Sequence, residues 1–179
     1  MTGPGTPGPP GVGGSGATRS VGLADADATR GFGRALAGVL RAGDLVVLTG
    51  PLGAGKTTLT QGLGEGLGVR GQVASPTFII ARVHPSIVGG PALVHVDAYR
   101  LGSLEELDAL DLDAGLEESV TVVEWGEGLA EVLSEDRLEI TIDRPRGGDG
   151  QEVLDAEAGV RQVTLRGVGA RWHGVALPG

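Results

Sequence analysis

The sequence predicts an α/β fold with three layers, in which a largely parallel central sheet lies between helices. Short apolar runs bounded by glycines alternate with stretches of helical periodicity, which is typical of such sheets. Residues 44–49, Asp-Leu-Val-Val-Leu-Thr, form a run too short for a helix and suited to a strand buried on both faces. Ligands of such folds bind at the carboxyl ends of the strands, so the functional site is expected there.

The other elements follow from the same patterns. Asp25 or Asp27 can cap a helix that ends near Arg41. A helix over residues 56–67 contains three glycines, each of which costs about 1 kcal/mol relative to alanine, so tertiary packing has to stabilise it. We further expect strands over residues 21–23, 77–83, 92–96, 120–123, 138–142 and 160–165, short helices over 103–110 and 128–133, and a loop over 145–150.

Composition divides the chain into three parts. Of its 44 glycines and prolines, 11 fall within the first 16 of 179 residues. Residues 1–20 lack large apolar groups and are expected to form a disordered tail. Residues 21–167 suffice for one domain, and residues 168–179 form an extension whose order the sequence does not indicate.

Charge and cysteine content exclude several classes of function. The chain has no cysteine, which excludes a disulfide scaffold, a cysteine nucleophile and a thiolate metal site. Its net charge of −9 disfavours a large nucleic-acid surface, so any contact with RNA should pass through a partner. It has no apolar run long enough to cross a membrane and no secretory signal pattern, and we therefore expect a cytoplasmic protein without membrane contact.

A phosphate-binding loop follows the first buried strand. Residues 50–57, Gly-Pro-Leu-Gly-Ala-Gly-Lys-Thr, match the Walker A pattern between a strand and a helix, and Lys56 is the only lysine beside 13 arginines. We expect ATP phosphates on the backbone of this loop, Lys56 at the β- and γ-oxygens, and the Thr57 hydroxyl on Mg²⁺. The predicted nucleotide-binding residues are Gly50, Gly53, Ala54, Gly55, Lys56, Thr57, Thr58, Ser75 and Thr77.

Two acidic residues complete the expected site, which is that of a three-layer P-loop NTPase. Asp97 and Glu124 each end a predicted strand, and parallel strands bring such ends to one edge of the sheet. One carboxylate would hold the magnesium shell and another would orient or activate water. We therefore predict catalytic roles for Lys56, Asp97 and Glu124, and metal contacts from Thr57, Asp97 and Glu124.

Other residues near the motifs allow more than one interpretation. Ser75-Pro-Thr77 lies where nucleotide switches place hydroxyls, although an ordinary proline turn explains it equally well. His95 fits a core histidine with satisfied hydrogen bonds better than a base, and Trp125 fits packing better than a lid. The acidic stretch 105–118 contains no cation and favours a solvated face over a docking patch. The chain has no asparagine and no second lysine with which to read guanine, and this favours ATP over GTP.

Four ordered motifs resemble the bacterial TsaE family, the small P-loop ATPases of tRNA threonylcarbamoyladenosine synthesis. They are the phosphate loop through Thr58, Ser-Pro-Thr-Phe ending at residue 78, His-Val-Asp-Ala-Tyr-Arg-Leu ending at Leu101, and Glu-Trp ending at Trp125. The resemblance covers about residues 21–143.

The resemblance implies an ATP- and Mg²⁺-dependent protein that works with TsaD and TsaB. Those partners transfer threonylcarbamoyl to adenosine 37 of tRNA, and the ATPase resets the complex between turnovers. The resemblance also implies that Thr57 and Glu124 lie at the magnesium, that Asp97 is needed for hydrolysis, and that Ser75 and Thr77 form the switch.

Two other functions remain compatible with the residues. A small-molecule P-loop kinase would use Asp97 or Glu124 as base, and only Arg144 and Arg146 in the late loop could serve as lid arginines. A nucleotide-gated binding module would need no hydrolysis. For the ATPase, turnover in isolation should be slow, because no stabilising arginine is evidently fixed beside the γ-phosphate. Arg100 is the nearest candidate by sequence.

Overall fold

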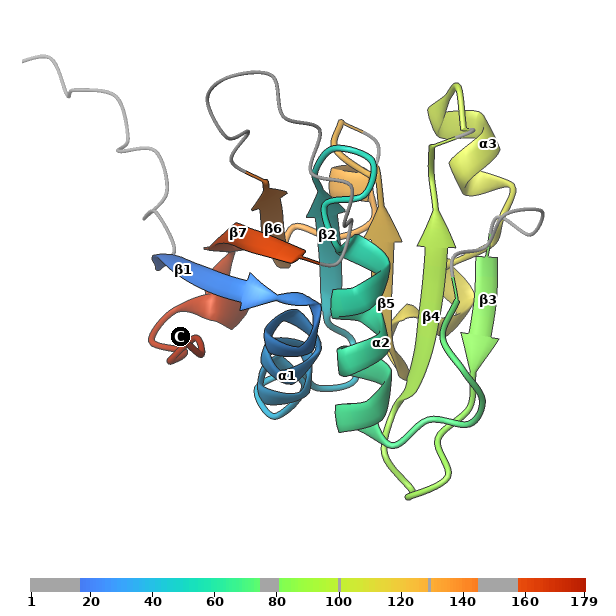
Figure 1. Ribbon diagram of the computed structural model, residues 1–179. Coiled ribbons are helices and arrows are strands. Elements are labelled where there is room, and N and C mark those ends of the chain that lie inside the picture. Colours follow the sequence, from blue (N-terminus) through green and yellow to red (C-terminus); the bar gives the residue numbers. More distant parts are fainter. Residues whose placement is uncertain (1–16, 75–80, 100, 129, 145–157) are drawn as a thin grey trace, which may run out of the picture.

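A computed structural model describes residues 17–74, 81–99, 101–128, 130–144 and 158–179. Seven strands form one sheet in the order β1-β7-β6-β2-β5-β4-β3, in which β6, β2, β5 and β4 are parallel to one another. The antiparallel strands β1, β7 and β3 extend the two edges (Figure 1). The predicted α/β class with a largely parallel central sheet is therefore confirmed.

The strands have these bounds: β1 Thr18–Asp25, β2 Leu45–Thr49, β3 Ala81–His84, β4 Ala92–Asp97, β5 Ser119–Glu124, β6 Arg137–Asp143 and β7 Ala158–Val168. The helices are α1 Ala26–Ala37, α2 Lys56–Leu67, α3 Leu104–Asp108 and α4 Asp113–Leu116, with 3-10 turns η1 Ala130–Val132 and η2 Ala170–Trp172. β1 begins inside the expected tail. Residues 1–16 and the expected loop 145–150 lie outside the described part of the chain.

Two expected helices differ from the structure. Asp25 caps α1 by accepting a hydrogen bond from the backbone N–H of Ala28, but the helix ends at Ala37, before Arg41. The helix expected over residues 128–133 is only the 3-10 turn η1. α1 stops at Gly38, a residue with low helix propensity, and the segment 128–133 is too short to form an α-helix without packing support.

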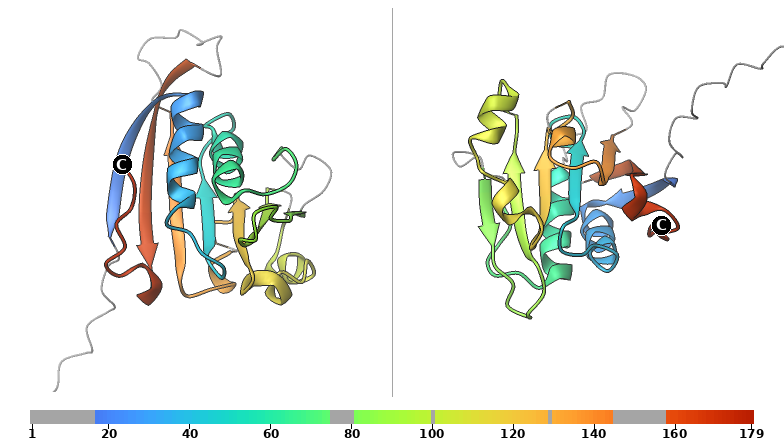
Figure 2. Two further views of the ribbon diagram at one scale, coloured as in Figure 1. Left: turned by 90° about the horizontal axis from the view of Figure 1, so that it is seen from below. Right: turned by 180° about the vertical axis from the view of Figure 1, so that it is seen from behind.

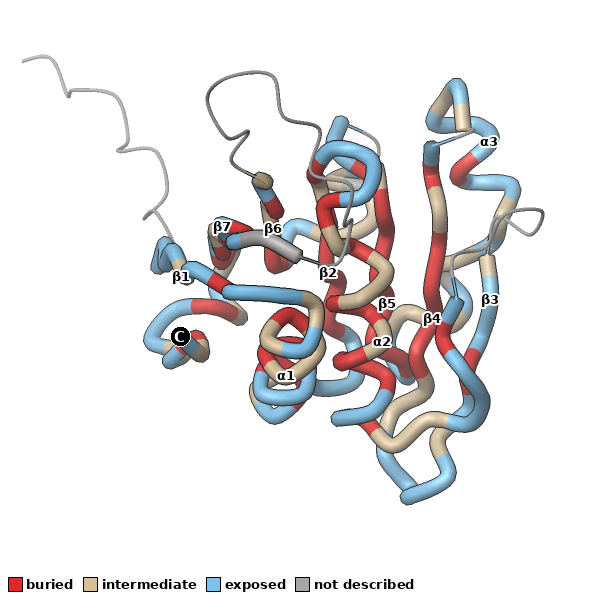
Figure 3. The backbone as a smooth tube through the Cα atoms, in the orientation of Figure 1, coloured by how far each residue is buried: buried red, intermediate tan, exposed pale blue. Residues whose placement is uncertain are grey.

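The sheet has one thickly covered face and one thinly covered face. Helices α1 and α2 lie side by side on the first face, over a continuous core that includes Leu36, Leu48 and Leu59 (Figures 1 and 3). Short segments cover the second face, where Val47 and Val96 are buried (Figure 2). β2 is buried on both faces, as its apolar run predicts.

Close packing explains the glycines of α2. A Cβ atom at Gly62 would overlap the backbone of Arg30, and one at Gly66 would overlap the Ala37 side chain. The absence of side chains there lets α1 and α2 approach backbone to backbone, which offsets the low helix propensity of glycine. This packing holds the first turn of α2 at the carboxyl ends of the parallel strands.

Part of the expected C-terminal extension, residues 168–179, packs against the domain. The Trp172 side chain is only 1% exposed and lies against Gly167, and Leu177 is also buried. Among the described residues no helix is long and apolar enough to cross a membrane.

Candidate nucleotide site

The phosphate loop connects β2 to α2 in the predicted position. Gly55 has φ +108°, in the left-handed region that a side chain would strain, and it directly precedes the first residue of the helix. The loop is closed by a hydrogen bond of 3.1 Å from the Ala54 N–H to the Pro51 carbonyl. The N–H groups at the start of α2 and the helix dipole thus face the end of the sheet, where they can bind an anion.

Lys56 is buried within this loop. Its Nζ donates hydrogen bonds to the carbonyls of Gly50 at 2.7 Å and Pro51 at 3.0 Å, and it lies 4.0 Å from the centroid of the Trp125 ring. Burial lowers the pKa of the Lys56 ammonium, while the carboxylates of Glu124 and Asp97 oppose that shift. A compact ammonium fits between two carbonyls and a ring, whereas a planar guanidinium would not.

Asp97 and Glu124 meet at one edge of the sheet. β4 and β5 are parallel, and these two residues are register partners at their ends. The Thr57 hydroxyl donates to Glu124 Oε1 at 3.4 Å, and Glu124 is 2% exposed. Asp97 is half-buried, and its Oδ1 accepts a hydrogen bond of 2.9 Å from the Tyr99 N–H.

The donor set at this edge fits Mg²⁺. Within the described ranges no group of three or more His, Cys, Asp or Glu residues could hold a metal. Magnesium usually takes one or two carboxylates and completes its shell with phosphate oxygens and water, and two carboxylates beside a hydroxyl supply such a set. Thr57 and Glu124, already in contact, are the residues that would hold the ion, with Asp97 next to them.

His95 lies on β4, two residues before Asp97 and beside the Glu124 carboxylate. It is fully buried, and its Nε2 is 3.3 Å from Glu124 Oε1. Neither ring nitrogen makes a hydrogen bond, so the expectation of a satisfied core histidine is wrong in that respect.

Trp125 and Tyr99 form a wall of the site. Trp125 has an unusual φ of +60° for a non-glycine residue, and its N–H donates to the Leu48 carbonyl at 2.9 Å. Its ring centroid is 5.2 Å from that of Tyr99, which is largely exposed. Trp125 therefore packs, as expected, but it packs on the ammonium of Lys56 and faces the site.

These groups line a cavity of about 500 Å³. Its lining includes Asp97, Glu124 and Trp125, and also Arg30, Gln61 and Arg161, which the motifs did not indicate. A sequence signal for Arg161 did exist: it alternates with Val163 and Leu165 on the buried face of β7, where a charged residue is unexpected.

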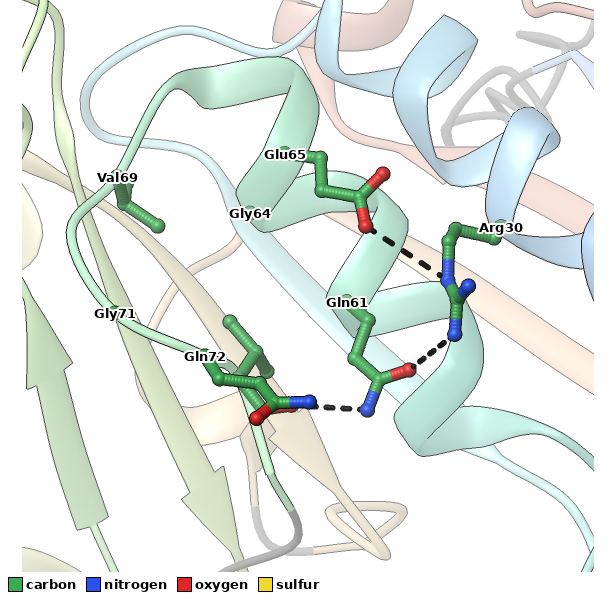
Figure 4. Close-up of a pocket in the computed structure, with 8 residues that line it drawn as sticks. Arg30, Gln61, Gly64, Glu65, Val69, Gly71 and Gln72 are labelled. Carbon is green, nitrogen blue, oxygen red and sulfur yellow. Dashed lines mark hydrogen bonds and ion pairs between the residues drawn. The ribbon is translucent and has the colours of Figure 1, made fainter.

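A second cavity of about 450 Å³ adjoins the first between α1, α2 and the segment after α2 (Figure 4). Arg30 donates to Gln61 Oε1 at 3.1 Å and lies 3.7 Å from Glu65 Oε1, as the figure shows. Gln61 in turn donates to the Val73 carbonyl at 3.0 Å. Arg30 and Gln61 border both cavities, but the second one contains no phosphate-loop residue.

Several predicted residues lie outside the described part of the chain. They are Ser75, Thr77, Arg100 and Arg146. The switch role of the first two stays a prediction.

Comparison with known proteins decides the family. A family model described as "Threonylcarbamoyl adenosine biosynthesis protein TsaE" matches residues 23–152. The chain belongs to the TsaE family. It is therefore a P-loop protein of the tRNA threonylcarbamoyladenosine pathway, and all four motifs lie within the matched residues.

Relatives named as TsaE proteins of this pathway support the assignment. The one from Streptomyces coelicolor is 64% identical over 144 residues, covering 80% of this chain and 93% of its own. The one from Bacillus subtilis is 36% identical over 150 residues, covering 81% and 83%. The crystal structure of Bacillus subtilis YdiB superposes with a TM-score of 0.65 at 28% identity, covering 88% of this chain and 90% of that one.

Proposed function

We propose that this chain is a magnesium-dependent ATPase that cycles a TsaD–TsaB complex during N6-threonylcarbamoyladenosine formation at position 37 of tRNA. The observation that carries the proposal is the register pair Asp97 and Glu124, which lines one cavity together with Lys56 and Thr57. Family membership supports the pathway. The net charge of −9 supports contact with tRNA only through partners, and a cytoplasmic location follows from the role.

Binding is the task of the phosphate loop. The backbone N–H groups of residues 53–58 and the positive end of α2 hold the phosphates. Lys56 already sits among carbonyls with a pKa lowered by burial, so an anionic phosphate oxygen is a better partner for its ammonium than a neutral carbonyl. Trp125 keeps the ammonium in place from the other side.

Hydrolysis is the task of the carboxylates. Thr57 and Glu124 would hold Mg²⁺, which would supply positive charge to the phosphate oxygens. Asp97 accepts the proton of the attacking water as the water oxygen bonds to the γ-phosphorus and the bond to the β-phosphate oxygen breaks. Slow turnover in isolation stays a prediction, because Arg100, the arginine that follows β4, lies outside the described residues.

The test is threonylcarbamoylation of tRNA by TsaD and TsaB with ATP under multiple-turnover conditions. Product should pass one equivalent with the intact chain and stop there with Lys56→Ala. Asp97→Asn and Glu124→Gln should behave like Lys56→Ala. The exposed Glu127→Gln, close in sequence to Glu124, is the matched control and should support full product.

Equal product with and without the intact chain would overturn the cycling role. Transfer of phosphate to a metabolite without free phosphate would instead favour a small-molecule kinase on the same fold. Equal support from ATP and a non-hydrolysable analogue would show a nucleotide-gated binding module.

A further inference from the structure

One arginine of α1 borders the nucleotide cavity although no motif includes it. Arg30 lines the same cavity as Lys56, Thr57 and Thr58, and its guanidinium contacts Gln61 on α2 (Figure 4). We propose that Arg30 binds a phosphate group of ATP or ADP, and that it leaves Gln61 to do so. This role rests on the proposed function, because it needs a nucleotide in the cavity.

The contacts of Arg30 in the structure are weak ones for a guanidinium. A terminal nitrogen donates to the amide oxygen of Gln61 at 3.1 Å, and this acceptor carries no charge. The Nε lies 3.7 Å from Glu65 Oε1, which is too long for a hydrogen bond, and this buried nitrogen has no hydrogen-bond partner among the described residues. A phosphate group attracts a guanidinium by its charge and can accept two N–H groups at once, so it is the better partner.

The ion pair with Glu65 does not commit Arg30 to its present place. Arg34, one turn further along α1, donates to Glu65 Oε2 at 2.7 Å, so Glu65 keeps a cation when Arg30 moves. The side chains of Arg30, Glu65 and Arg34 are 39%, 48% and 51% exposed. Ion pairs between side chains this exposed contribute little free energy, so Arg30 loses little by leaving.

The position of Arg30 on α2 puts the phosphates within its reach. A Cβ atom at Gly62 would overlap the carbonyl of Arg30, so the backbone of this arginine lies directly on α2. Gln61, its present partner, follows Thr57 by four residues and Thr58 by three, which is one helical turn. The first turn of α2 supplies the N–H groups expected to hold the phosphates. A long, partly exposed side chain crosses one turn by changing rotamers alone.

Movement of Arg30 also changes the hydrogen bonding of Gln61. The Gln61 side chain accepts from Arg30 through its oxygen and donates to the Val73 carbonyl at 3.0 Å through its nitrogen. These two contacts join α1, α2 and the segment after α2 in one chain of hydrogen bonds (Figure 4). When Arg30 turns to a phosphate, Gln61 keeps only the second contact. Nucleotide binding is thereby linked to the segment 69–73, which lines the second cavity.

Calorimetric titration of the full chain with ATP and with ADP, both with Mg²⁺, tests the proposal. Arg30→Gln should weaken both affinities by about tenfold, because a charge-assisted hydrogen bond to phosphate is lost. Arg30→Lys should recover part of the loss. Arg34→Gln is the matched control, because it removes the closer partner of Glu65 from the same helix while Arg34 lines neither cavity. It should bind like the unsubstituted chain.

Affinities of Arg30→Gln and Arg34→Gln within twofold of each other would overturn the proposal. If both variants bind normally, Arg30 does not contact the nucleotide. If both bind weakly, the effect comes from Glu65 and the packing of α1 on α2.

The Nε–H resonance of Arg30 in the ¹⁵N-labelled unsubstituted chain gives a second measurement, which does not need Arg30→Gln to fold. It is assigned by its disappearance in Arg30→Lys, and it should shift on addition of ADP and also of inorganic triphosphate. A constant position, or a shift with ADP alone, would overturn the phosphate contact. Normal nucleotide binding by the unsubstituted chain with failure of these tests would leave the proposed ATPase intact, whereas no binding by that chain would remove both.

Discussion

Two buried ionic clusters lie at opposite ends of β2, and they differ in how completely their polar atoms are paired. At the start of the strand, Arg171 Nε and a terminal nitrogen each donate to Asp44 at 2.9 Å, and the same terminal nitrogen donates to the Val39 carbonyl at 2.8 Å. Asp44 also accepts from the Arg41 N–H at 2.8 Å, and the guanidinium lies 4.4 Å from the Trp172 ring centroid. Both oxygens of the buried Asp44 carboxylate are therefore paired, and Arg171 joins the C-terminal segment to the start of β2.

At the other end, the cluster around Glu124 is incompletely paired. His95 has two ring nitrogens without hydrogen bonds, although its Nε2 lies 3.3 Å from the carboxylate. The ammonium of Lys56 is bound to neutral carbonyls while two carboxylates stand nearby. Buried polar groups with incomplete pairing cost stability and are typical of sites that bind ligands. We infer that the Asp44 cluster stabilises the fold, whereas the Glu124 cluster gives up stability in order to bind a nucleotide.

The largest effect is expected at Lys56. Lys56→Ala should lower ATP hydrolysis by about 1,000-fold, because the positive charge that stabilises the transferred phosphate is lost. Its temperature of thermal unfolding without nucleotide should change little, since the lost contacts with two carbonyls and the Trp125 ring are offset by relief of a buried ammonium. Phosphate release and a melting curve measure the two effects.

Lys56→Arg sharpens this prediction. It keeps the charge, but the wider group does not fit between the carbonyls and Trp125, so activity should stay low. Full activity in Lys56→Arg would show that charge alone is needed.

The next effect concerns the opposite cluster. Arg171→Met should lower the free energy of unfolding by about 3 kcal/mol, because it leaves the buried Asp44 carboxylate without its partner. Hydrolysis per folded molecule should be unchanged. Urea unfolding of Arg171→Met and of the double variant Arg171→Met/Asp44→Asn checks that the unpaired carboxylate is the cause. The double variant should regain part of the lost free energy of unfolding. Loss of activity in Arg171→Met without loss of stability would contradict a purely structural role for the Asp44–Arg171 cluster.

A smaller effect of opposite sign is expected at His95. His95→Leu should raise the free energy of unfolding by about 1 kcal/mol, since it replaces an imidazole with two unpaired nitrogens by an apolar group. Hydrolysis should fall at the same time, because Glu124 loses the neighbour that limits its position. Urea unfolding and phosphate release from one preparation measure both. A lower free energy of unfolding for His95→Leu would show that His95 stabilises the fold, as the Asp44–Arg171 cluster does.

The smallest effect is a pH dependence from His84. Burial lowers the pKa of His84 below its ordinary value of 6.5, so the folded chain takes up a proton there less readily than the unfolded chain. Stability should therefore decrease as the pH falls below about 6.5, and be unaffected by His84 above it. His84→Leu should flatten this part of the curve in urea unfolding between pH 5 and 8.

The exposed His173 is the control for this experiment. Its replacement by leucine should leave the pH profile unchanged. An unchanged profile for His84→Leu as well would contradict the assignment of the pH effect to His84.

Elements with a strong local signal were predicted well. α2 begins and ends at the expected residues, and the apolar run of β2 is a strand buried on both faces. The helix expected over residues 128–133 was wrong, since the structure has only a 3-10 turn there. A segment this short forms an α-helix only when other elements pack against it, and the local pattern does not show such packing. The described part of the nucleotide site was also predictable, since Lys56 and Thr57 belong to one motif and Asp97 and Glu124 end parallel strands.

The sequence by itself determined the phosphate loop, the strand-end carboxylates and the family. Each of these depends on contiguous residues or on the geometry of a single strand, which neighbouring positions encode directly. Only the tertiary structure decided that Arg161 reaches Ala54, that Arg171 closes on Asp44, and that His95 stands below Glu124 without hydrogen bonds. The first two contacts join residues more than 100 positions apart, which become neighbours only after the antiparallel strands pair with the parallel sheet. The third depends on side-chain alignment within a packed core, which no local pattern records.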